Sequence, residues 1–205
     1  MTRLYDYLDS GNGYKARLLF ALLAQPYRWT ELDIVKGATR TPQFLAKNPN
    51  GRVPTLELDD GTFLAESNAI LWYLAEGSPF IPAERLGRGQ VLQWMFFEQY
   101  SHEPYVATPR FIVRHLPADS PRRAELPDRL ARGRDALSVM DQHLRTRQYF
   151  VGEQYSIADI ALYAYTHVAP EAGLDLSAYP SVLSWLGRVA SHPRHVPITF
   201  QPPCD

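Results

Sequence analysis

The apolar positions of the first third of the chain alternate between strand-like and helix-like spacing. Leu4 to Leu8 alternates imperfectly and predicts a first strand, and Tyr27 to Leu32 predicts a second. Between them, Tyr14 to Leu23 carries its leucines on one side of a predicted helix. A strand, a helix and a second strand in this order normally form parallel neighbours with a right-handed crossover. The chain is therefore expected to begin with a βαβ unit.

A short helix, a hairpin and a longer helix are expected next. Pro42 suits the first turn of a short helix. Thr55 to Leu58 and Thr62 to Leu64 read as two hairpin strands around the turn signal Asp59-Asp60-Gly61. A helix with apolar positions at helical spacing then opens at Ser67. The resulting order β-α-β-α-β-β-α is that of the thioredoxin-like fold, which is an α/β architecture.

The pattern changes at Gly77 to Pro82, where glycine and prolines interrupt every period. After this stretch the chain is expected to be helical, including a helix that Ser156 and Asp159 start with a capping box. We therefore predict three parts: a thioredoxin-like domain, a linker and an all-helical C-terminal domain. Their expected bounds are residues 1–76, 77–86 and 87–205.

Amino-acid composition indicates a globular protein without an internal disulfide. The chain has 205 residues, of which 45% are hydrophobic and 21% charged, so it is expected to fold around a packed core. Its net charge of −1 gives no basis for binding nucleic acid or an anionic membrane surface. The single cysteine, Cys204, excludes an internal disulfide and fits a reducing compartment, most simply the cytoplasm. No spacing of histidines and acids predicts a metal site.

Candidate chemistry lies at the hairpin and at the helix that follows it. Val53-Pro54 follows the turn signal Asn50-Gly51, and an X-Pro bond in a tight turn can be cis. Because proline lacks an N–H, the backbone groups of Val53 are candidates to pair with an extended ligand. Glu66-Ser67 stands where a helix begins and exposes unpaired N–H groups, which favour a carboxylate.

These two motifs together resemble the glutathione-binding half of the glutathione transferase family, and the resemblance extends over nearly the whole chain. It implies that glutathione is the cosubstrate. Val53 and Pro54 would meet the cysteinyl backbone of glutathione, and Glu66 and Ser67 would hold its γ-glutamyl end. The glycine carboxylate of glutathione needs a cation or donors. The candidates, which stay unranked, are Lys36, Thr39, Arg40 and Arg52.

The residues expected near the glutathione thiol indicate which class of glutathione transferase the chain resembles. Ser10-Gly11-Asn12-Gly13-Tyr14-Lys15 resembles the Thr/Ser-x-Asn-Gly-x-Lys loop of bacterial nu-class transferases and their fungal prion-like relatives. This likeness implies that Ser10 and Asn12 jointly approach the glutathione sulfur. Tyr5 and Tyr7 read more simply as core or cross-strand aromatics.

The resemblance implies a transferase that activates the glutathione thiol for attack on a small electrophile. It also implies glutathione-dependent peroxidase and disulfide reductase activities as further reactions. A zeta-type isomerase is an alternative, although those enzymes typically carry a Ser-Ser-Cys loop, which this chain lacks. A non-catalytic adaptor or stress regulator of the same fold is a second alternative. A homodimer is expected from the family and from the aromatic-rich segment Trp94 to Tyr100.

Overall fold

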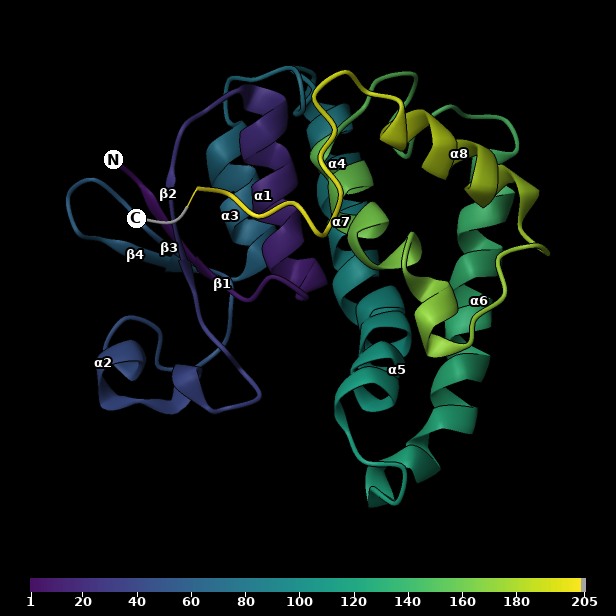
Figure 1. Cartoon of the computed structure of the whole chain (residues 1–205). Coiled ribbons are helices and arrows are strands. Elements are labelled where there is room, and N and C mark those ends of the chain that lie inside the picture. Colours follow the sequence, from purple (N-terminus) through teal and green to yellow (C-terminus); the bar gives the residue numbers. More distant parts are fainter. Residues whose placement is uncertain (204–205) are drawn as a thin grey trace. The chain divides into compact units, whose positions relative to one another are not determined.

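A four-stranded sheet organises the N-terminal part of the computed structural model, which describes residues 1–203 (Figure 1). The strand order is β2-β1-β3-β4. β1 pairs with β2 in parallel, whereas the β1–β3 and β3–β4 pairs are antiparallel. The strands are β1 (Arg3–Asp6), β2 (Arg28–Glu31), β3 (Thr55–Glu57) and β4 (Phe63–Ala65).

One longer helix and two short ones connect these strands, and a second longer helix follows the last strand. Figure 1 shows α1 and α3 side by side, and the two helices contact each other. The helices are α1 (Gly11–Leu23), the 3₁₀ turn η1 (Ala38–Arg40), α2 (Pro42–Leu45) and α3 (Ser67–Ala75). The predicted order β-α-β-α-β-β-α and the thioredoxin-like fold are therefore confirmed.

The apolar core of this part lies between the sheet and its two longer helices. Side chains from β1, β2, β3, α1 and α3 are buried there, which is the outcome expected for leucines and aromatics at these spacings. The members of this cluster are Leu4, Ala16, Phe20, Trp29, Leu56 and Ile70.

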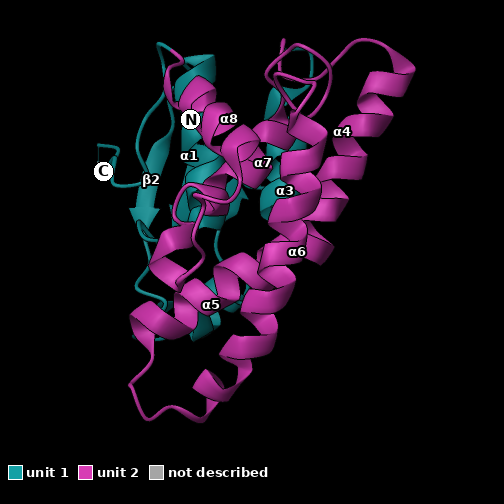
Figure 2. Ribbon diagram, turned by 90° about the vertical axis from the view of Figure 1, so that its right-hand side faces the viewer, with its two compact units in different colours: residues 1–78, 193–205 teal, residues 79–192 magenta. Residues whose placement is uncertain are grey.

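The chain divides into two compact units (Figure 2). Unit 1 comprises residues 1–78 and 193–205, and unit 2 comprises residues 79–192. Unit 2 is formed by helices, as expected. These are α4 (Arg85–Phe97), the π-helical turn η2 (Glu98–His102), α5 (Glu103–His115), η3 (Pro121–Glu125), α6 (Leu126–Leu144), α7 (Ile157–Thr166), η4 (Ala169–Ala172) and α8 (Pro180–Ala190).

The last described residues differ from the expected domain bounds, which placed 87–205 together. Residues 193–203 pack on unit 1 instead. The buried Arg17 guanidinium donates to the carbonyls of Ile198 and Phe200 at 2.8 and 2.9 Å. The Tyr14 hydroxyl donates to the Val196 carbonyl at 2.7 Å. These contacts with α1 hold the segment, and the apolar periodicity of the sequence carries no signal for them.

A buried carboxylate organises the centre of unit 2. Asp159 accepts from the backbone N–H of Phe150 and of Ser156, from the Ser156 hydroxyl and from Trp185 Nε1, at 2.9–3.0 Å. Burial raises the pKa of Asp159 to about 6, although these four donors oppose the shift. The carboxylate is therefore still ionised at neutral pH. The predicted capping box at the start of α7 is confirmed.

Within residues 1–203, no helix has the length and apolar character that crossing a bilayer requires.

Candidate functional site

The loop before α1 is held by its own serine and by a close packing contact. Ser10 is the N-cap of α1, and its hydroxyl accepts from the Gly13 N–H at 3.2 Å. A Cβ on Gly13 would lie 1.5 Å from Asp6 Oδ1, so only glycine fits there. Asn12 lies between these two anchors, half-buried in the first turn. The N-terminus of α1 therefore presents Ser10 and Asn12 from a fixed backbone.

The Val53-Pro54 peptide bond is cis. Asn48 supports the turn before it, because its Nδ2 donates to the Arg52 carbonyl at 2.9 Å and to Thr55 Oγ1 at 3.1 Å. Among residues 1–203, neither the N–H nor the C=O of Val53 forms a hydrogen bond. Both backbone groups therefore remain for an extended ligand, as the sequence suggested.

The start of α3 shows a strained backbone next to a helix terminus. Glu66 has φ 68° and ψ 115°, an uncommon conformation for a residue with a side chain. Its exposed carboxylate forms no hydrogen bond or ion pair with another side chain in the described chain. No described side chain caps α3, whose first residue is the buried Ser67. A carboxylate acceptor and a row of helix N–H donors therefore stand next to each other.

A buried side-chain network joins the two halves of this site. Lys15 Nζ donates to Ser67 Oγ at 3.2 Å and to Asn68 Oδ1 at 3.3 Å. The Ser67 hydroxyl in turn donates to Asn12 Oδ1 at 3.3 Å. The side chains of Lys15 and Ser67 are buried. The structure thus brings Asn12 and Ser67, which are 55 residues apart, into direct contact.

Lys15 is the last residue of the motif that the sequence singled out, but the sequence assigned it no role. The available signal was its position three residues after Asn12, because residues i and i+3 share a helix face. Its burial depends on how α1 packs against α3, which the sequence pattern does not specify. The network therefore became visible only with the fold.

The four candidates for the glycine carboxylate separate into two groups. Lys36 is 84% exposed and pairs with Asp33 at 2.9 Å, and this bond raises the lysine pKa. Thr39 and Arg40 instead lie against the turn before Val53. Arg40 Nη1 donates to the Asn50 carbonyl at 3.1 Å, and Thr39 is buried in η1. Arg52 is exposed one residue before Val53. Thr39, Arg40 and Arg52 thus lie beside the cis-proline turn.

Tyr5 of β1 is engaged within the sheet. Tyr5 donates to Glu57 Oε2 at 2.6 Å, and burial together with this bond raises the Tyr5 pKa to about 12. Because Glu57 belongs to the neighbouring strand β3, Tyr5 has the cross-strand role that the sequence favoured, and it also makes an edge contact with Phe44 of α2. Cys204 lies outside the described residues.

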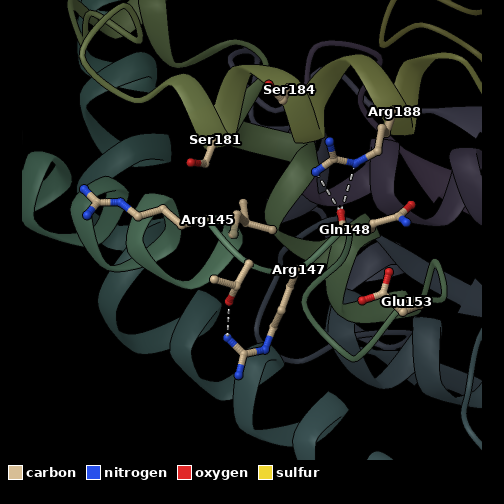
Figure 3. A pocket seen from close by; sticks show the side chains of 9 residues that line it. Arg145, Arg147, Gln148, Glu153, Ser181, Ser184 and Arg188 are labelled. Atoms are coloured by element: carbon tan, nitrogen blue, oxygen red, sulfur yellow. Dashed lines mark hydrogen bonds between the residues drawn. The ribbon is translucent and has the colours of Figure 1, made fainter.

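Unit 2 carries an open polar depression of about 540 Å³ where the end of α6 faces α8 (Figure 3). Arg145 pairs there with Asp141 at 3.6 Å, whereas the other two arginines donate to backbone carbonyls. Arg188 donates to the Gln148 carbonyl through Nε and Nη2 at 3.1 and 2.9 Å, and Arg147 donates to the His143 carbonyl at 3.4 Å. Arginines that satisfy carbonyls at a helix C-terminus stabilise that helix end. Arg147 thus supports the end of α6, and Arg188 supports the loop that follows it.

Comparison with known proteins shows that each unit is similar to one domain of the glutathione S-transferase family. The family profile described as "Glutathione S-transferase, N-terminal domain" matches residues 10–76. The profile described as "Glutathione S-transferase, C-terminal domain" matches residues 94–193. A crystal structure of glutathione S-transferase from Pseudomonas fluorescens Pf-5 is 57% identical, with a TM-score of 0.92. The match covers 96% of this chain and 98% of that chain.

Two further relatives carry informative names. The disulfide-bond oxidoreductase YfcG of Escherichia coli K12 is 30% identical over 200 residues, which cover 94% of this chain and 92% of that protein. A glutathione transferase of Burkholderia graminis, crystallised with two glutathione molecules per subunit, is 27% identical with a TM-score of 0.82. That match covers 94% of this chain and 85% of the other. The chain described here belongs to the glutathione S-transferase family.

Proposed function

We propose that unit 1 binds glutathione along the line from Glu66 to Val53. Glu66 accepts the γ-glutamyl ammonium, and the N–H groups at the start of α3 take the neighbouring carboxylate. The backbone of Val53 pairs with the cysteinyl unit, which directs the sulfur to Ser10 and Asn12. The observation that carries this proposal is the 3.3 Å bond between Ser67 and Asn12, because it joins the two motifs in one place.

The proposed chemistry is activation of the glutathione thiol. A free cysteine thiol has a pKa of about 8.5, so only a few per cent is thiolate at pH 7. Lowering the pKa by two units requires about 2.7 kcal/mol of preferential stabilisation of the anion. The Asn12 amide, the Ser10 hydroxyl and the positive end of the α1 dipole are suitable donors for that stabilisation.

The reaction that we favour is reduction of a small organic or glutathionyl disulfide, as expected for a nu-type loop. One glutathione thiolate attacks a disulfide sulfur, forms a mixed disulfide and expels the other half as a thiolate. A second glutathione thiolate attacks the mixed disulfide, which releases oxidised glutathione and the second thiolate product. The names of the YfcG relative and of the doubly liganded Burkholderia graminis structure support this choice.

Electrophiles and organic peroxides are further proposed substrates, since the same thiolate attacks them. A zeta-type isomerase is less well supported, because residues 10–15 contain no cysteine. A non-catalytic adaptor is disfavoured because Glu66, Ser67 and Asn12 are all retained. The proposed place of action is the cytoplasm, where glutathione is kept as a thiol.

The test of this function is turnover by the purified protein with glutathione. The substrates are hydroxyethyl disulfide, cumene hydroperoxide and an aryl halide. We expect activity with the disulfide, and we expect Cys204→Ser to retain it because both reducing thiols come from glutathione. If the protein neither binds glutathione on an affinity resin nor turns over any of the three substrates, the proposal is overturned in favour of an adaptor. Loss of activity in Cys204→Ser alone would refute the two-glutathione scheme.

A homodimer is a further part of the proposal. Phe96 and Tyr100 are 69% and 83% exposed on α4 and η2, and Leu92 of α4 is also exposed. Exposed aromatic side chains close together on a helix surface are typical of an interface. Light scattering should report twice the 23.4 kDa chain mass at micromolar concentration. We expect Phe96→Asp to dissociate the dimer, whereas Val139→Asp on α6 serves as the control. A 23 kDa species in the wild type would contradict the dimer.

A further inference from the structure

We propose that Lys15 is a positioning residue that fixes the Asn12 amide toward the glutathione sulfur and adds a positive charge behind it. The inference deepens the proposed function and rests on it. Neither the family motif nor the names of the relatives assigns this role to Lys15. The role follows from the burial of Lys15 and from the direction of its hydrogen bonds.

The position of Lys15 is unusual for its side chain. Lysine is rarely fully buried, because removing an ammonium from water is costly unless other groups compensate. Lys15 nevertheless has 0% exposure, and its Nζ donates to Ser67 Oγ and Asn68 Oδ1. Both acceptors are in the first turn of α3, where a carboxylate of glutathione is expected. The ammonium thus lies under the part of the site that receives a negatively charged ligand.

The hydrogen-bond directions form a chain from Lys15 to Asn12. An ammonium only donates, so Ser67 Oγ is its acceptor. The one proton of the Ser67 hydroxyl is then directed to Asn12 Oδ1. With its oxygen turned toward Ser67, the Asn12 side chain carries its two N–H donors on the opposite nitrogen. Lys15 therefore determines which end of the Asn12 amide is presented to a thiolate.

The same chain changes the role expected for Ser67. Its hydroxyl accepts from Lys15 and donates to Asn12, so it serves as a link within the protein. The γ-glutamyl carboxylate is then held chiefly by the backbone N–H groups of α3. Ser67→Ala should accordingly affect the thiol as well as binding, because it disconnects Asn12 from Lys15 and leaves the ammonium in place.

The experiment is an ultraviolet titration of the thiolate of enzyme-bound glutathione, together with calorimetry of S-methylglutathione, which has no ionisable thiol. The variants are Lys15→Met, which removes the charge, and Lys15→Arg, which keeps it. Lys47→Met is the matched control, since Lys47 is also in unit 1 but stacks on the rings of Tyr5 and Phe63. Circular dichroism checks that each variant is folded.

We expect Lys15→Met to raise the bound thiol pKa by about one unit, which lowers the thiolate fraction about tenfold well below that pKa. Lys15→Arg should stay closer to the wild type, and Lys47→Met should be unchanged. If Lys15→Met does not fold, Ser67→Ala provides the test and should raise the thiol pKa by a smaller amount. A wild-type pKa in whichever of these two variants folds would overturn the role of Lys15 alone. A wild-type protein that does not bind glutathione would overturn the proposed function with it.

Discussion

Replacing Asn12 with alanine should lower kcat/KM for hydroxyethyl disulfide at neutral pH by about tenfold to a hundredfold. This range corresponds to the loss of one hydrogen bond to a charged group, which contributes about 1.5–3 kcal/mol. The deficit should shrink as the pH rises, because glutathione then ionises without help from the protein. The measurement is the pH profile of kcat/KM between pH 6 and 9.

Ser10→Ala is the companion variant in that experiment. Its effect should be smaller, because a hydroxyl has one donor and that of Ser10 also accepts the Gly13 N–H. An Asn12→Ala enzyme with the wild-type pH profile would refute the proposal that Asn12 stabilises the glutathione thiolate. The next candidates would then be Ser10 alone and the half-buried Tyr7 of the same loop.

Replacing Asp159 with alanine should destabilise the protein by about 3–5 kcal/mol, the cost of leaving several buried donors without their charged partner. The four donors come from Phe150, Ser156 and Trp185, so the start of α7 and its contact with α8 both depend on this carboxylate. Chemical denaturation followed by circular dichroism measures the effect.

Asp135→Ala is the matched control for that experiment, because Asp135 is an exposed aspartate of α6. Its free energy of unfolding should stay within about 0.5 kcal/mol of the wild type. If Asp159→Ala were as stable as Asp135→Ala, the capping box would not contribute to the stability of unit 2.

The sequence predicted those elements that local patterns determine. The apolar spacing identified the strands and helices of residues 1–76, and Ser156 with Asp159 predicted the start of α7. The π-helical turn Glu98–His102 was not predicted, because its one-residue insertion leaves the apolar pattern of the neighbouring helices nearly intact. The exposed Phe96 and Tyr100 belong to the aromatic-rich segment on which the prediction of a homodimer rests.

The site shows the same division between local and long-range information. Val53-Pro54 and Glu66-Ser67 are recognisable because each is a short motif with its own backbone chemistry. Lys15 and the packing of residues 193–203 on α1 depend on contacts between segments far apart in the chain. Such contacts follow from tertiary packing, which a single sequence taken by itself does not display. Ser67 accordingly appeared as a ligand for glutathione, whereas the fold gives its hydroxyl a second, internal role.

The most direct test of the central claim is a crystal structure of the protein with glutathione. Our account predicts that the γ-glutamyl group lies at Glu66 and the start of α3, and that the cysteinyl backbone pairs with both backbone groups of Val53. The glutathione sulfur should lie within hydrogen-bonding distance of Asn12 Nδ2. Glutathione bound away from Val53, or a sulfur directed at Tyr7 instead of Asn12, would contradict the account.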